Sequence, residues 1–208
     1  GKPLEDICAG ESFEPESPDA LAPFYVGFTS GSTGVPKGYR RNHLSWIASF
    51  VADAQEFGVG QDDIVAAPGS MSHSLFLYAA IHALQIGACV ILCRRFRPDL
   101  VMTEMRNHGA SVLYAAPTQL ALLIEAPGAP VTTLRRILTS GSKWSSSISA
   151  KIPERFPGAD FAEFYGASEM SFVTVRKSAE NCPEASVGRA FYGVSIKIRD
   201  SASDEVPI

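Results

Sequence analysis

The sequence is poor in the residues that build metal centres and disulfide frameworks. It contains four cysteines and four histidines among 208 residues. No two cysteines form a C-x-x-C pair, and no His/Cys cluster has the spacing of metal ligands. This pattern is consistent with a reducing cytoplasm, which is the location we expect. Cys89 and Cys93 lie four positions apart in an apolar stretch, so we expect both to be small buried side chains on one strand face.

Long apolar runs and an excess of positive charge are also missing. No run approaches the roughly 20 residues that span a bilayer, and no secretory signal is visible. The net charge of −4 argues against a nucleic-acid partner. The sequence starts at Gly1 rather than Met, so we expect a boundary left by processing or cloning. At 46% hydrophobic residues, the chain can bury the core of one domain or of part of a larger one.

The most informative stretch that is present runs from Thr29 to Gly38 and reads TSGSTGVPKG. Glycines let backbone N–H groups turn toward an anion, hydroxyls add donors, and lysine adds a positive charge. An apolar run, Phe24–Phe28, precedes the stretch and predicts a strand, and a helix is predicted from Asn42 to Phe57. We therefore predict a strand–loop–helix site for nucleotide phosphates. It is not a Walker A loop, because Lys37 precedes glycine instead of following it.

Short apolar segments alternate with helical segments over most of the chain. The expected strands are 24–28, 64–67, 89–93, 111–115, 136–139, 161–164, 172–176 and 195–199, and the expected helices are 42–57, 75–86, 99–107, 118–125 and 145–156. This alternation predicts an α/β fold with a doubly wound, mostly parallel sheet and helices on both faces. Ligands of such sheets bind at the carboxyl ends of strands. Thr29, Ser140 and Tyr165 follow expected strand ends, so we expect them to converge on one crevice.

A second motif, Tyr165–Glu169, reads YGASE. An aromatic ring such as that of Tyr165 can stack on a nucleotide base, the hydroxyl of Ser168 can bond a phosphate, and the carboxylate of Glu169 can hold Mg²⁺. A serine hydrolase is an alternative, because Gly166–Met170 approximates G-x-S-x-G. However, Met170 replaces the last glycine, and a strand rather than a helix is expected next. Ser140–Lys143 also fits the S-x-x-K pattern of penicillin-binding proteins, but no companion motif accompanies it.

The two motifs together resemble the adenylate-forming enzymes, which include acyl-CoA synthetases, peptide-synthetase adenylation domains and luciferases. TSGSTGVPKG resembles their signature loop over its full length, and YGASE resembles their Tyr-Gly-x-Thr-Glu motif, with Ser168 in place of Thr. The distance between the motifs also resembles that of the family. The resemblance implies that residues 24–208 are a fragment of the large N-terminal AMP-binding (adenylation) domain, without the C-terminal lid domain. Residues 1–23, rich in Pro, Glu, Ser and Asp, are expected to be an arm or linker.

The resemblance also implies a reaction and its residues. A carboxylic acid, most closely a fatty acid, is activated with ATP and Mg²⁺ and transferred to coenzyme A. Lys37, Ser168 and Glu169 are the expected catalytic residues, Glu169 the metal ligand, and His73 the substrate contact at the mouth of the acyl pocket. The expected nucleotide contacts are Thr29, Ser30, Gly31, Ser32, Thr33, Gly34, Lys37, Gly141, Ser142, Lys143, Tyr165, Gly166, Ala167 and Ser168.

Two other functions stay open beside an acyl-CoA ligase. The chain could belong to an adenylation domain for amino acids or aryl acids, or it could be a non-catalytic nucleotide-binding fragment. The family's ribose-binding Asp and C-terminal catalytic Lys would lie beyond Ile208, so we expect the chain alone to be inactive or weakly active. Neither the acid nor the oligomeric state follows from the sequence.

Overall fold

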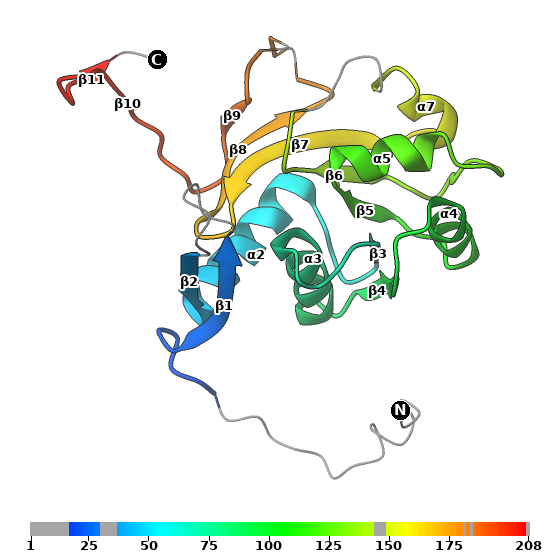
Figure 1. Ribbon diagram of the computed structural model, residues 1–208, viewed down its shortest axis with the longest axis horizontal. Coiled ribbons are helices and arrows are strands. Elements are labelled where there is room, and N and C mark those ends of the chain that lie inside the picture. Colours follow the sequence, from blue (N-terminus) through cyan, green and yellow to red (C-terminus); the bar gives the residue numbers. More distant parts are fainter. Residues whose placement is uncertain (1–16, 30–36, 144–148, 181, 184, 207–208) are drawn as a thin grey trace.

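The computed structural model describes residues 17–29, 37–143, 149–180, 182–183 and 185–206. Its elements, labelled in Figure 1, are β1 (Pro23–Thr29), β2 (Lys37–Asn42), α2 (His43–Phe57), β3 (Ile64–Ala67), α3 (Ser74–Gln85), β4 (Cys89–Leu92), α4 (Pro98–Asn107), β5 (Val112–Ala115), α5 (Pro117–Ile124), β6 (Arg136–Thr139), α7 (Ile152–Arg155), β7 (Asp160–Ala167), β8 (Ser171–Lys177), β9 (Arg189–Ala190), β10 (Ile198–Arg199) and β11 (Glu205–Val206).

A seven-stranded sheet forms the centre of the molecule, in the order β4-β3-β5-β6-β7-β8-β9. The strands from β4 to β7 are mutually parallel, and β8 and β9 continue the sheet in antiparallel fashion. Helices connect the parallel strands, as short apolar strands buried on both faces require. The predicted doubly wound, mostly parallel α/β fold is therefore confirmed.

The two faces of the sheet are covered by different helices (Figure 1). Alternate residues of each strand point to opposite faces, so Val65 packs with α2 and α3, whereas its neighbour Ala66 packs with α4 and α5. Tyr114 and Leu113 divide in the same way between the two faces. The chain thus has two hydrophobic cores, separated by the sheet.

Helix α2 begins and ends at recognisable capping residues. The side chain of Asn42 accepts a hydrogen bond from the backbone N–H of Ser45 at 2.9 Å, which satisfies one of the free donors of the first turn. Gly58 ends the helix in the left-handed conformation, with φ of 62°. The predicted boundaries, Asn42 and Phe57, are confirmed by these caps.

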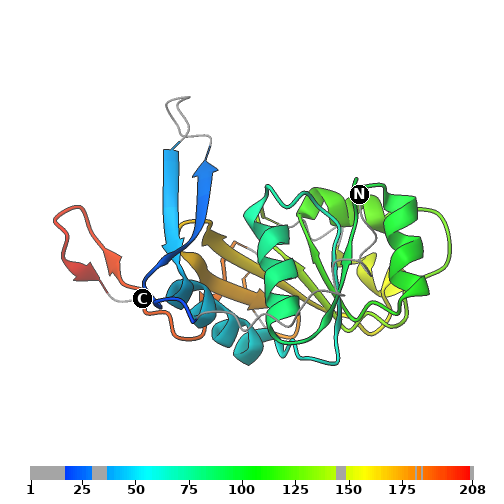
Figure 2. The ribbon, with the colours of Figure 1, turned by 90° about the horizontal axis from the view of Figure 1, so that it is seen from below.

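The segment before α2 differs from the predicted strand–loop–helix. Lys37–Asn42 forms a second strand, β2, which pairs antiparallel with β1, so that Thr29 lies opposite Lys37. This hairpin is separate from the central sheet and projects from it (Figure 2). The strand was missed because its KGYRRN sequence has no apolar run, although its tyrosine and arginines alternate as in a strand. Residues 30–36 of the signature stretch lie outside the described residues.

Other boundaries also differ from the predictions. Strand β7 continues to Ala167, so Tyr165 lies within a strand and not after it. Of the predicted helix 145–156, the structure describes α7 at Ile152–Arg155, and residues 144–148 lie outside the described ranges. The strand predicted at 195–199 is limited to β10. The prediction for Cys89 is wrong, because β4 is an edge strand and leaves this cysteine exposed, while Cys93 is half-buried.

Candidate active site

A cavity of about 850 Å³ opens at the carboxyl ends of the parallel strands. Three residues of its lining directly follow the last residue of a strand: Cys93 follows β4, Ala116 follows β5, and Ser140 follows β6. This is the edge at which open α/β sheets bind ligands. The volume falls within the usual range for a small-molecule pocket, about 300–1,000 Å³.

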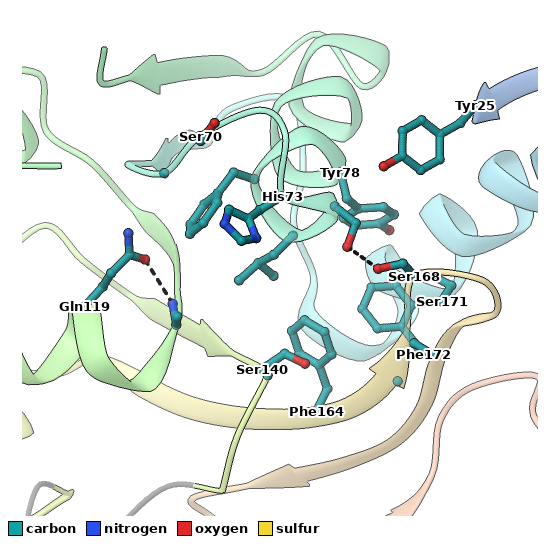
Figure 3. Close-up of a pocket in the computed structure, with 18 of the residues that line it drawn as sticks. Tyr25, Ser70, His73, Tyr78, Gln119, Ser140, Phe164, Ser168, Ser171 and Phe172 are labelled. Atoms are coloured by element: carbon teal, nitrogen blue, oxygen red, sulfur yellow. Dashed lines mark hydrogen bonds between the residues drawn. The ribbon is translucent and has the colours of Figure 1, made fainter. Parts of the chain in front are cut away.

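Four residues of the YGASE motif, Gly166–Glu169, line the cavity, and Figure 3 shows Ser168 among them. Ser168 and Glu169 lie in the short turn that joins β7 to β8. The Ser168 hydroxyl is 2.7 Å from the hydroxyl of Ser74, the first residue of α3. Gly166 has no room for a side chain, because a Cβ there would lie 2.0 Å from the carbonyl oxygen of Ser171. The glycine therefore allows the close approach of the two strands that places Ser168 beside α3.

Glu169 is exposed at the rim of this cavity, next to Ser168. Within the described ranges no group of three or more His, Cys, Asp or Glu side chains could hold a metal ion. Mg²⁺ usually binds to one or two carboxylates and completes its shell with water and phosphate oxygens. A single exposed carboxylate fits Mg²⁺ that arrives with a nucleotide, and it does not fit a resident metal.

His73 also lines the cavity, at the residue before α3. Its ring meets the ring of Phe76 edge-on, with the ring centres 6.4 Å apart. Figure 3 shows His73 between Gln119 on one side and Ser168 on the other. The structure thus brings together His73, Ser168 and Glu169, three of the residues that the sequence singled out.

Several expected site residues lie elsewhere. Gly141 lines the cavity with Ser140, but Ser142 and Lys143 do not. Tyr165 is 58% exposed and does not belong to the cavity wall. Lys37 is exposed on the hairpin and is likewise outside the cavity wall. Of the three residues expected to converge, Ser140 lies at this cavity and Tyr165 does not, whereas the side chain of Thr29 lies outside the described part of the structure.

Sequence reasoning missed an aromatic and basic wall of the cavity, which begins beside Ser168 and runs toward the hairpin (Figure 3). It consists of Tyr25 and Arg41 from the hairpin, Trp46 from α2, Tyr78 from α3 and Phe172 from β8. The signal that could have revealed it is the period-two alternation in β2, which places Tyr39 and Arg41 on one face.

Behind this wall lies a buried polar cluster. The Tyr114 hydroxyl donates to Asp53 Oδ2 at 2.7 Å, and His82 Nδ1 is 3.6 Å from Asp53 Oδ1. Burial raises the pKa of the Asp53 carboxyl to about 7 and lowers the pKa of His82 to about 4. The ring of Tyr78, which lines the cavity, lies 5.7 Å from the ring of His82 between centres and so connects this cluster with the cavity.

The geometry around Ser168 does not fit a serine hydrolase. A nucleophile elbow places the serine between a strand and a helix, whereas Ser168 lies in a hairpin turn between β7 and β8. Its hydroxyl meets another serine hydroxyl and no histidine among the described residues.

The sheet and its strand-end cavity define a small-molecule-binding α/β domain, and comparison with known proteins identifies the family. The AMP-binding enzyme family matches residues 2–208, and the chain belongs to it. Its members are adenylate-forming enzymes, and acyl-CoA ligases are the relatives at moderate identity. None of the helices in the described ranges is long and apolar enough to cross a membrane.

Two curated relatives and one solved structure illustrate the similarity. YhfT of Bacillus subtilis (strain 168), named as an uncharacterized acyl-CoA ligase, is 37% identical over 187 residues, 89% of this chain and 39% of YhfT. VraA of Staphylococcus haemolyticus, named as a candidate long chain fatty acid-CoA ligase, is 38% identical over 175 residues, 84% of this chain and 37% of VraA. The chain therefore spans about two fifths of these relatives. The inhibitor-bound N-terminal domain of FACL13 from Mycobacterium tuberculosis shares the fold, with a TM-score of 0.85 and 20% identity over 98% of this chain and 52% of that one.

Proposed function

We propose that this chain carries the ATP-binding core of a ligase that activates a carboxylic acid, most closely a fatty acid, as an acyl-adenylate and transfers it to coenzyme A. The observation that carries the proposal is the meeting of His73, Ser74, Ser168 and Glu169 at one strand-end cavity. Family membership and the names of YhfT and VraA support it.

In the first half-reaction, a carboxylate oxygen of the acid attacks the α-phosphorus of ATP, and pyrophosphate leaves. Ser168 bonds a phosphate oxygen, and Glu169 holds the Mg²⁺ that neutralises the phosphate charge. Gly141, Gly166 and Ala167 border the nucleotide in this cavity. Positioning and charge stabilisation are the protein's main contributions to such a transfer.

Residues outside the cavity wall complete the nucleotide site in the proposal. The exposed ring of Tyr165 stacks on adenine, and Ser142 and Lys143 continue the adenine turn. Lys37 and the first six residues of the signature stretch bind the β- and γ-phosphates. These six residues are Thr29, Ser30, Gly31, Ser32, Thr33 and Gly34. The hairpin that carries Thr29 and Lys37 also contributes Tyr25 and Arg41 to the cavity wall, which supports this assignment.

In the second half-reaction, the thiol of coenzyme A attacks the acyl carbon, and AMP leaves. His73 at the cavity rim orients the carboxylate. We place the reaction in the cytoplasm, with no nucleic-acid partner. Residues 1–23 serve as an arm and residues 24–208 as part of the AMP-binding domain, with the lid domain on another part of the longer protein. The 208 residues alone are expected to be inactive or weakly active.

The test is acid-dependent exchange of pyrophosphate into ATP, measured with the complete protein that carries this chain. The panel contains fatty acids of different length, aryl acids and amino acids. Exchange with one acid class is expected, and Glu169→Gln and Lys37→Ala should reduce it at least about tenfold, since each removes a charge beside the phosphates. Glu205→Gln, which changes an exposed carboxylate far from the cavity, is the matched control. Mg·ATP binding without exchange for any acid would contradict the ligase and favour a non-catalytic nucleotide-binding fragment.

A further inference from the structure

Arg41 is a cation built into the wall of the cavity. It lies on β2 opposite Tyr25, is 9% exposed, and lines the cavity together with Trp46 and Tyr78. Its guanidinium carbon is 5.7 Å from the centre of the Trp46 ring. Arginine is rarely buried without an anionic partner, because taking its charge out of water is costly.

The hydrogen-bond partners of Arg41 within the described ranges are all neutral. Its guanidinium donates to the Ser45 hydroxyl at 3.2 Å, to the Ser45 carbonyl at 2.8 Å and to the Ser49 hydroxyl at 3.1 Å. No carboxylate of the described residues forms an ion pair with it. Arg189, in contrast, is half-exposed and still holds Glu56 through two hydrogen bonds, at 2.6 and 2.7 Å. Burial lowers the pKa of Arg41, which is the expected effect of a desolvated cation.

The neighbouring Trp46 gives a second, independent observation. Its side chain is 3% exposed, and its indole Nε1 has no hydrogen-bond partner within the described part of the chain. Indole N–H is a donor only, as is guanidinium. Two buried donors that line one cavity, one charged and one unpartnered, fit a ligand group that accepts hydrogen bonds and carries negative charge.

The rest of this wall is apolar. Tyr25, Tyr78 and Phe172 present aromatic rings to the cavity, and Figure 3 shows the hydroxyl of Ser168 beside Tyr78 and Phe172, with Tyr25 beyond Tyr78. Aromatic walls favour the apolar body of a ligand. Tyr25 lies opposite Arg41 in the hairpin, so an acid that reacts beside Ser168 and extends past Tyr78 toward Tyr25 would bring its far end toward Arg41.

We propose that Arg41, with the indole of Trp46, selects acids that carry a second carboxylate at the end remote from the reacting one. Nε and Nη2 of Arg41 already donate to Ser45 and Ser49, so within the described residues Nη1 is the part of the guanidinium left to donate to a ligand, and a carboxylate is a group that accepts such a charged hydrogen bond. The inference rests on the proposed ligase function and narrows its substrate to dicarboxylic acids with an apolar middle.

The test compares α,ω-dicarboxylic acids with monocarboxylic acids of equal length, in short, medium and long pairs, in the complete protein. Pyrophosphate exchange gives kcat/KM for each acid, and equilibrium dialysis of labelled acids gives affinity without any chemistry. The variants are Arg41→Gln, Arg41→Lys and Trp46→Phe, and the matched control is Arg40→Gln on the exposed side of the same strand. Each result is the ratio of dicarboxylate to monocarboxylate within one variant, so a lower folded fraction cancels.

We expect the wild-type ratio to exceed about ten for at least one length, which corresponds to roughly 1.4 kcal/mol. Arg41→Gln should bring it to about one or below, Trp46→Phe should lower it partly, and Arg41→Lys and Arg40→Gln should largely keep it. A wild-type preference for monocarboxylates, or a ratio that Arg41→Gln leaves unchanged, would overturn the proposal. A ratio that depends on Arg41 in dialysis, without exchange for any acid, would support the site and contradict the ligase function.

Discussion

The two helical layers of this sheet differ in chemistry although they cover the same strands. The side chains that α4 and α5 bury are all apolar, among them Met102, Met105 and Leu120. The layer of α2 and α3 buries polar groups as well, among them Asp53 and His82. Trp46 and Tyr78 of this second layer also line the cavity.

The difference shows where a fold can hold functional chemistry. An apolar layer gains stability from burial alone and tolerates no unpaired polar atom. A layer with paired polar groups stabilises less per residue, but it can present charged and hydrogen-bonding side chains to a ligand. We therefore expect changes at the buried apolar residues of α4 and α5 to affect folding alone and changes at the buried polar residues of α2 and α3 to affect pH dependence and ligand binding.

The largest expected loss of stability comes from the apolar layer. Leu120 is fully buried on α5, and Leu120→Ala should lower the free energy of unfolding by about 3 kcal/mol through lost burial and the cavity left behind. Leu122 on the same helix is 53% exposed, so Leu122→Ala is the matched control, with an effect below about 1 kcal/mol. Urea unfolding measures both. Equal losses for the two variants would contradict the assignment of α5 as a packing helix.

The next effect concerns the ion pairs that join α2 to the antiparallel strands. Glu56 contacts both Arg189 and Lys177, and the hydrogen bonds from Arg189 lower the pKa of the Glu56 carboxyl to about 2. Glu56→Gln should cost about 2 kcal/mol near neutral pH, because two cations lose their partner.

The sign of the pH effect follows from this lowered pKa. The unfolded carboxyl titrates near ~4.3, so the contribution of Glu56 is present above that pH and is lost as the pH falls toward 2. Urea midpoints at several acidic pH values should fall less steeply in Glu56→Gln than in the wild type. Glu205→Gln, in the exposed pair with Lys197, should change little. A steeper fall in Glu56→Gln would refute the pairing.

The polar cluster should show itself in opposite pH slopes. The Asp53 carboxyl, with a pKa of about 7 in the folded protein, holds its proton more tightly there than in the unfolded chain. Its contribution to the free energy of unfolding therefore decreases as the pH rises from ~4 to ~7. The His82 imidazole, with a pKa of about 4 in the folded protein, loses its proton on folding. Its contribution to the free energy of unfolding therefore increases as the pH rises from ~4 to ~6.5. These slopes nearly cancel in the wild type.

Single variants should separate the two slopes. Asp53→Asn should leave a stability that rises with pH over this range, and His82→Gln a stability that falls, each by up to about 1.4 kcal/mol per pH unit. Urea unfolding between pH 4 and pH 7 is the measurement, and Glu104→Gln, which changes an exposed carboxylate paired with His108, is the control. Parallel profiles for the two variants would show that Asp53 and His82 are not the titrating pair.

The smallest expected effect on stability is at the contact between Ser74 and Ser168. Ser74→Ala removes one hydroxyl pair at the cavity and should cost about 1 kcal/mol or less. It should still slow pyrophosphate exchange, because the Ser168 hydroxyl loses the partner that orients it. Ser72→Ala is the control, since Ser72 bonds only to Ser70 among the described residues. Unchanged exchange in Ser74→Ala would remove this contact from the proposed site.

The sequence by itself determined the alternation of strands and helices and hence the doubly wound sheet, because buried parallel strands need continuous apolar runs. It also determined the boundaries of α2, through Asn42 and Gly58, and the resemblance carried by the two motifs. Ser168 and Glu169 could be named in advance because they belong to the second motif, and His73 because the family resemblance implied a substrate contact there.

Only the tertiary structure decided which side chains share the cavity. Strand β2 was missed because a polar hairpin is held by pairing with β1 and not by an apolar run. Arg41 and Trp46 therefore had no predicted place near Ser168, more than a hundred residues further along the chain. The separation of Asp53 from His82 and Tyr114 in sequence likewise concealed their contact, since the pKa of a buried group depends on neighbours that only folding brings together.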